Sequence, residues 1–153
     1  MSRLLAIETS AESCSAALDI EGEVGERFEH AAMKHAELLL RMGSSLLGDA
    51  GIRASELDAI AFGRGPGSFT SLRIGIGVVQ GLAWGADRPV VPVSSLAAVA
   101  QQAWDLAGNP DHCVCVAMDA RMQEVFSAVF RDGGRGVVEP LGAETVGPAA
   151  DVN

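Results

Sequence analysis

The chain has 153 residues, of which 48% are apolar, and a formal net charge of −9 at pH 7. This length suffices for one domain-sized hydrophobic core. The acidic balance excludes an extended nucleic-acid-binding surface, because such surfaces depend on clustered lysine and arginine.

Three strands are predicted first, over Leu4–Ile7, Cys14–Ile20 and Val24–Glu29. The first is a short apolar run that ends in the acidic residue Glu8, which is typical of a buried strand and not of a signal peptide. Polar turns separate the three runs, so they predict an antiparallel meander.

The cellular location is indicated by cysteine usage and hydropathy. The chain has an odd number of cysteines, three, which favours a reducing compartment such as the cytoplasm. No run approaches the roughly 18 apolar residues that a membrane span needs, so we expect no membrane association.

A helix is predicted over Lys34–Ala50, with Gly51 as its stop signal. Its apolar residues cover an arc of roughly 160°, whereas packing on one sheet requires only about 100°. Either a second element of the same domain or another protein covers the excess. The arc consists of Leu39, Leu40, Met42, Gly43, Leu46, Leu47 and Ala50.

A fourth strand, Leu57–Phe62, leads into the glycine-rich segment Gly63–Thr70. Glycine has no Cβ, so backbone N–H groups in this segment can approach a phosphate, a carboxylate or another chain closely. A tight turn between a strand and a helix explains the same composition, and the segment alone leaves both interpretations open.

The next helix is predicted over Thr70–Gly85, and Gly77, Gly81 and Gly85 recur in it every four residues. An interior helical glycine costs about 1 kcal/mol relative to alanine. We therefore expect a neighbouring helix or strand to approach this glycine ridge closely.

The remaining pattern is a strand at Pro89–Val93, a helix that begins at Ser94 or Ser95 and ends near Ala107, and strands at His112–Met118 and Glu124–Phe130. The order βββαβαβα predicts an α/β fold with a ribonuclease H-like, actin-like ATPase lobe. We expect this lobe over residues 1–108, followed by the start of a truncated second lobe, two strands and then loop, over 109–153.

Four segments resemble the bacterial tRNA threonylcarbamoyladenosine biosynthesis family TsaB, also called YeaZ, of the actin-like ATPase superfamily. Within them, Gly-Arg-Gly-Pro-Gly-Ser-Phe-Thr followed by Arg-Ile-Gly-Ile-Gly is highly specific to that family. The segments are Leu5–Ser10 with Cys14 and Ser15, His35–Leu39, Gly63–Gly81, and Asp119–Met122 with Glu124 and Val125. The resemblance covers residues 3 to about 130.

The resemblance implies a noncatalytic scaffold of the tRNA threonylcarbamoyladenosine (t6A) machinery, with no catalytic residue, no metal and no cofactor of its own. The catalytic relative TsaD has the metal motif Asn-His-Leu-Glu-Gly-His where this chain has Ser94–Val99. It further implies that TsaD binds the first two helices and that TsaE is a third component. ATP or ADP is then expected only at an interface of the complex, and tRNA contact only indirectly. Two copies are expected to pair through the same face when TsaD is absent. The expected interface residues are Leu39, Leu40, Leu46, Leu47, Ile74, Val78 and Leu82.

Two other function classes remain as alternatives. An actin-like phosphotransferase would hold ATP between the first-strand turn and the glycine loop, and a glycoprotease-like peptidase rests on fold analogy alone. The candidate nucleotide-binding residues are Thr9, Ser10, Gly63, Gly65 and Gly67.

Overall fold

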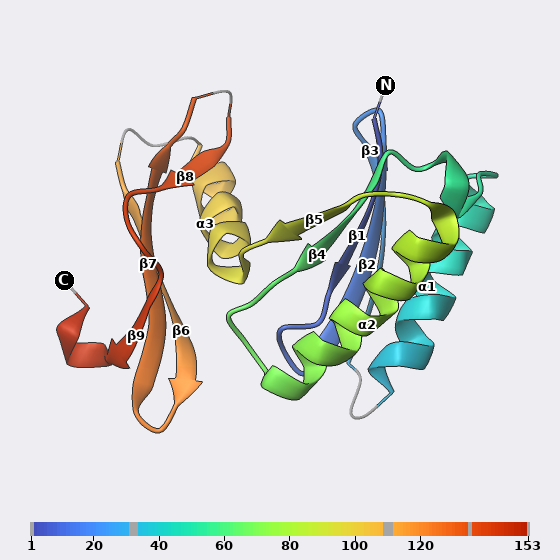
Figure 1. The fold of residues 1–153 in the computed structure, drawn as a ribbon. Coiled ribbons are helices and arrows are strands. Elements are labelled where there is room, and N and C mark those ends of the chain that lie inside the picture. Colours follow the sequence, from blue (N-terminus) through green and yellow to red (C-terminus); the bar gives the residue numbers. More distant parts are fainter. Residues whose placement is uncertain (1, 31–33, 109–111, 135, 153) are drawn as a thin grey trace. The chain divides into compact units, whose positions relative to one another are not determined.

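The computed structural model describes residues 2–30, 34–108, 112–134 and 136–152 (Figure 1). The chain divides into two compact units, residues 1–93 and 94–153. No helix in these described ranges is long and apolar enough to cross a membrane.

The first unit is a five-stranded sheet with two helices on one face (Figure 1). The sheet has the order β3-β2-β1-β4-β5, in which β1, β2 and β3 are antiparallel and β4 and β5 run parallel to β1. This is the predicted meander followed by two crossover connections. The strands are β1 Arg3–Glu8, β2 Ser13–Ile20, β3 Glu23–His30, β4 Ala59–Gly63 and β5 Val90–Val93, and the helices are α1 His35–Asp49, η1 Ala54–Glu56 and α2 Phe69–Ala86.

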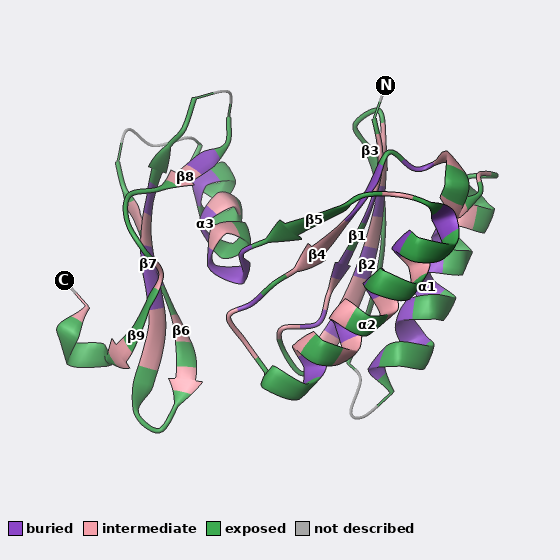
Figure 2. Cartoon of the chain, viewed as in Figure 1, coloured by how far each residue is buried: buried purple, intermediate pink, exposed green. Residues whose placement is uncertain are grey.

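Helices α1 and α2 lie side by side, with α1 packed on β2 and α2 on β4. Alternate side chains of the central strands, such as Leu5, Ile7 and Leu18, point to these helices and form the core of the unit. The thiol of Cys14 is part of this core, where burial and the nearby Glu29 raise its pKa. Strands β3 and β5 at the two sheet edges are exposed along their lengths (Figure 2).

The second unit contains α3 Ser95–Leu106 and a small antiparallel sheet, and its core lies between them. The expected boundary between residues 108 and 109 is corrected to 93 and 94, because α3 packs on β6, β7 and β8 through Leu96, Ala100 and Trp104. The expected loop after the second strand is also corrected, because two further short strands pair with β7. The strands are β6 Val114–Arg121, β7 Glu124–Asp132, β8 Val138–Pro140 and β9 Thr145–Pro148, followed by η2 Ala149–Asp151.

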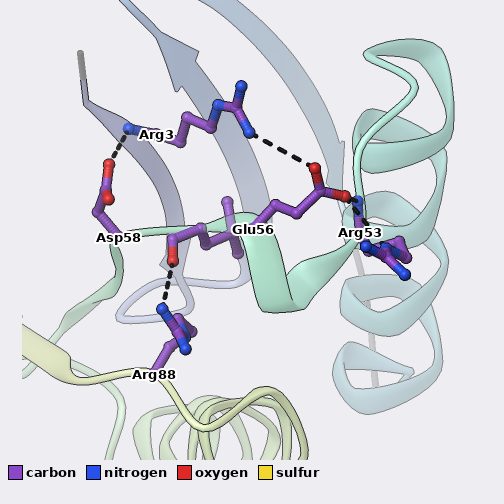
Figure 3. Close-up of polar contacts among 6 residues, drawn as sticks. Arg3, Arg53, Glu56, Asp58 and Arg88 are labelled. Carbon is purple, nitrogen blue, oxygen red and sulfur yellow. Dashed lines mark hydrogen bonds and ion pairs between the residues drawn. The ribbon is translucent and has the colours of Figure 1, made fainter.

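Polar contacts hold η1 and the two residues that follow it, Leu57 and Asp58, to neighbouring parts of the chain (Figure 3). The backbone N–H of Arg3 donates to Asp58 Oδ2 at 2.7 Å, and Arg88 Nη1 donates to the carbonyl of Leu57 at 3.5 Å. Glu56 Oε2 accepts the backbone N–H of Arg53 at 3.0 Å and its Nε–H at 3.2 Å. These hydrogen bonds, with a smaller contribution from the charges of Arg53 and Arg3, lower the pKa of Glu56.

Replacing Glu56 by glutamine should make the stability of the first unit less dependent on pH in the acidic range. A carboxyl whose pKa is lower in the folded state stabilises the fold above its unfolded pKa, about 4.3, and this contribution disappears as pH falls through the folded value. Thermal unfolding of the wild type and Glu56→Gln from pH 7 to pH 3 measures the effect. The two curves should converge at low pH, and a constant difference across the range would contradict this assignment.

Candidate functional site

The glycine loop Gly63–Gly67 packs against the turn that follows β1, so the structure brings the candidate nucleotide-binding residues together. A Cβ on Gly67 would lie 2.6 Å from Ser10 Cβ and 3.0 Å from the Ser10 carbonyl carbon. A Cβ on Gly63 would lie 2.5 Å from Cδ and 2.6 Å from Oε1 of Glu8. The space that the missing Cβ atoms leave beside Gly63 and Gly67 is therefore filled by Glu8 and Ser10 of the same chain.

Thr9 is 2% exposed and lies against α2. A Cβ on Gly75 would meet Thr9 Oγ1 and would lie 3.2 Å from Cγ2 and 3.3 Å from Cβ of Thr9. The sequence interpretation missed both Gly75 and Glu8 as contacts of this turn. A signal for Gly75 was present, because an interior helical glycine needs a packing reason. Gly65 adopts φ of +92°, a conformation that favours glycine, beside Leu72.

The expected partner interface is changed by the burial of two of its seven residues. Leu39 is 0% exposed and Leu46 is 3% exposed, and both belong to the core of the first unit. They are excluded from a surface of the folded monomer, because α2 and the sheet cover that part of the arc on α1. Leu40 is 47% exposed, whereas four residues are half-buried, namely Leu47, Ile74, Val78 and Leu82.

The glycine ridge of α2 is exposed, and no described neighbour packs on it. A Cβ on Gly77, Gly81 or Gly85 would meet nothing within 4 Å. The predicted close neighbour is therefore not supplied by the described part of this chain. Together these residues define the α1–α2 surface, which consists of Leu40, Leu47, Ile74, Gly77, Val78, Gly81, Leu82 and Gly85.

Trp84, which the sequence interpretation missed, extends this surface at the C-terminal end of α2. Its side chain is 91% exposed, more than almost every other large apolar side chain described. It lines an open groove together with Gln80, Ala83, Asp87, Arg88, Pro89 and Val90. An exposed tryptophan beside half-buried aliphatic residues is typical of a protein interface.

The segment Ser94–Val99 forms the start of α3. Ser94 is the N-cap residue, and its Oγ accepts the backbone N–H of Ala97 at 3.2 Å. The side chains of this segment therefore cap α3 and pack it. Among the described residues, no three histidine, cysteine or acidic side chains are grouped so that they could hold a metal ion.

Comparisons with known proteins agree with the sequence resemblance. Residues 25–151 match the family described as TsaD, tRNA N6-adenosine threonylcarbamoyltransferase. The protein named tRNA threonylcarbamoyladenosine biosynthesis protein TsaB from Haemophilus influenzae is 48% identical over 130 residues, which cover 84% of this chain and 54% of that protein. The protein of the same name from Escherichia coli is 44% identical over 135 residues, which cover 88% of this chain and 58% of that protein. The chain thus spans little more than half the length of these relatives.

A solved structure of YeaZ from Pseudomonas aeruginosa superposes with a TM-score of 0.88 at 48% identity, covering 97% of this chain and 68% of that one. A second structure, described as an uncharacterized protein with similarity to peptidase YeaZ from the same organism, gives a TM-score of 0.92 at 47% identity, covering 100% of this chain and 69% of that one. The predicted α/β fold class is thereby confirmed, and the chain belongs to the TsaB (YeaZ) family.

Proposed function

We propose that this chain is a noncatalytic subunit of the machinery that makes threonylcarbamoyladenosine in tRNA, and that it binds a TsaD-type catalytic subunit through the α1–α2 surface. The relatives from Haemophilus influenzae and Escherichia coli are named for that biosynthesis. The match to the TsaD family supports a partner of related fold. We place this function in the cytoplasm, with TsaE as a third component and with nucleotide bound only at an interface of the complex.

The observation that carries the proposal is the exposed glycine ridge of α2. Gly77, Gly81 and Gly85 each cost about 1 kcal/mol relative to alanine, and no described residue of the chain packs on them. Half-buried Ile74, Val78 and Leu82 lie on the same helix. Such a surface suits a partner helix whose backbone approaches closely and whose apolar side chains cover these aliphatic residues.

The alternatives have weaker support. An ATP-binding phosphotransferase would use the glycine loop, but Glu8 and Ser10 of the same chain already lie against Gly63 and Gly67 of that loop. A peptidase role is favoured only by the name given to one related structure. Tight binding and turnover of MgATP by the chain would support the phosphotransferase. Loss of t6A in cells that lack this chain would support the subunit that we propose.

The variant Gly81→Leu tests the proposed binding surface. A Cβ at this exposed position would meet nothing within 4 Å in the monomer, so thermal stability should be unchanged or raised. Affinity for TsaD from the same organism, measured by calorimetry, should fall at least about tenfold, because the leucine keeps the partner helix at a distance. The matched control is Ala103→Leu at an exposed position of α3.

Binding of Gly81→Leu to TsaD at wild-type affinity would exclude the α1–α2 surface as the interface. The same variant tests self-association, because two copies are proposed to pair through this surface when TsaD is absent. Light scattering of the wild type should then show a dimer, and Gly81→Leu should be a monomer.

A further inference from the structure

The start of α2 is held by the turn after β1, and residues Glu8–Ser10 are called the β1 clamp. The backbone N–H of Ser68, the N-cap residue of α2, donates to the carbonyl of Ser10 at 2.7 Å. Further along the helix, Gly75 lies so close to Thr9 that even a single Cβ would overlap its side chain. The first two turns of α2 are thus placed against two consecutive residues of the clamp, Thr9 and Ser10.

Glu8 fixes the clamp from its other side. Its Oε1 accepts the backbone N–H of Ser10, and its carboxylate covers the face of Gly63 at the end of β4. β1 and β4 are neighbouring parallel strands, so the clamp contacts the ends of two adjacent strands of the sheet. A shift of the clamp relative to the sheet therefore carries the start of α2 with it.

The same helix bears most of the α1–α2 surface. Gly75 faces the clamp, whereas Gly77, only two residues later, faces open space. Gly75 and Gly77 therefore lie on different sides of α2. We propose that Thr9 is a positioning residue for partner binding, in that its packing on Gly75 sets the depth of α2 and so the shape of the α1–α2 surface. This inference rests on the proposed function.

The test combines a disruptive variant with its structural rescue. Gly75→Ala forces α2 and Thr9 apart, because the alanine Cβ would overlap Oγ1 of Thr9. Affinity for TsaD should fall about tenfold or more at a temperature where circular dichroism shows the variant fully folded. Thr9→Ala removes Oγ1 and Cγ2, so the double variant Gly75→Ala with Thr9→Ala should regain affinity to within about threefold of Thr9→Ala alone.

A merely stabilising contact would lower the melting temperature of Gly75→Ala and leave the affinity of the folded protein unchanged, and this result would overturn the inference. Failure of the double variant to regain affinity would overturn it as well. The control Gly48→Ala places a Cβ in open space on α1 and should bind as the wild type does. If the wild type itself does not bind TsaD, the proposed function fails, which separates the two claims.

Discussion

Replacing Leu39 by alanine is expected to lower the free energy of unfolding of the first unit by about 3 kcal/mol. The side chain is 0% exposed and belongs to the core between the helices and the sheet. Truncation removes a buried isobutyl group and leaves a cavity that close-packed neighbours fill only in part. Urea denaturation followed by circular dichroism measures this loss.

The neighbouring residue supplies a matched control. Leu40 is 47% exposed, so Leu40→Ala should change stability by less than about 0.5 kcal/mol while weakening the binding of TsaD. If Leu39→Ala kept its stability and lost only binding, Leu39 would be an interface residue after all. The pair therefore separates the core part of the arc on α1 from its exposed part.

This contrast shows how far the sequence determines the α1–α2 surface. Helical periodicity identifies the apolar arc correctly, because the 3.6-residue repeat depends only on spacing. It does not identify which residues of the arc the same unit covers. That depends on how α2 and the sheet pack around α1, because together they bury Leu39 and Leu46 but leave Leu40 exposed.

The elements of the first unit could be predicted because its strands and helices have long, regular patterns between clear turn signals. The short strands β8 and β9 could not, since each has only three or four residues and contains proline. They become strands through pairing with β7, a tertiary effect that local propensity does not contain.

The glycine loop can be recognised from its composition, but its contacts cannot. The residues that pack against the loop are determined by the register of β1 against β4. This register brings Glu8 over Gly63. Predicting the contact between Gly75 and Thr9 would have required the crossing of α2 over the end of β1. Periodicity does not supply such distances between elements.

Trp104→Ala is expected to have the largest effect on the second unit, a loss of about 3–5 kcal/mol. Trp104 is 3% exposed and lies in a core cluster with Leu96, Val116 and Phe130, among others. A unit this small has little apolar area besides this cluster. The lost stability should therefore leave the second unit unfolded in a large fraction of the molecules. Hydrogen exchange resolved to individual segments should show lost protection in β6 and β7.

The same measurement decides to which sheet α3 belongs, because the apolar stripe of α3 predicts only that some sheet covers it. Packing on β6–β8 predicts that amides of β1 and β4 stay protected in Trp104→Ala. Loss of protection in β4 and β5 with intact β6 and β7 would instead support the boundary at residues 108 and 109. Leu106→Ala is the matched control two residues later on the same helix. Its side chain is 84% exposed, so both units should keep their protection.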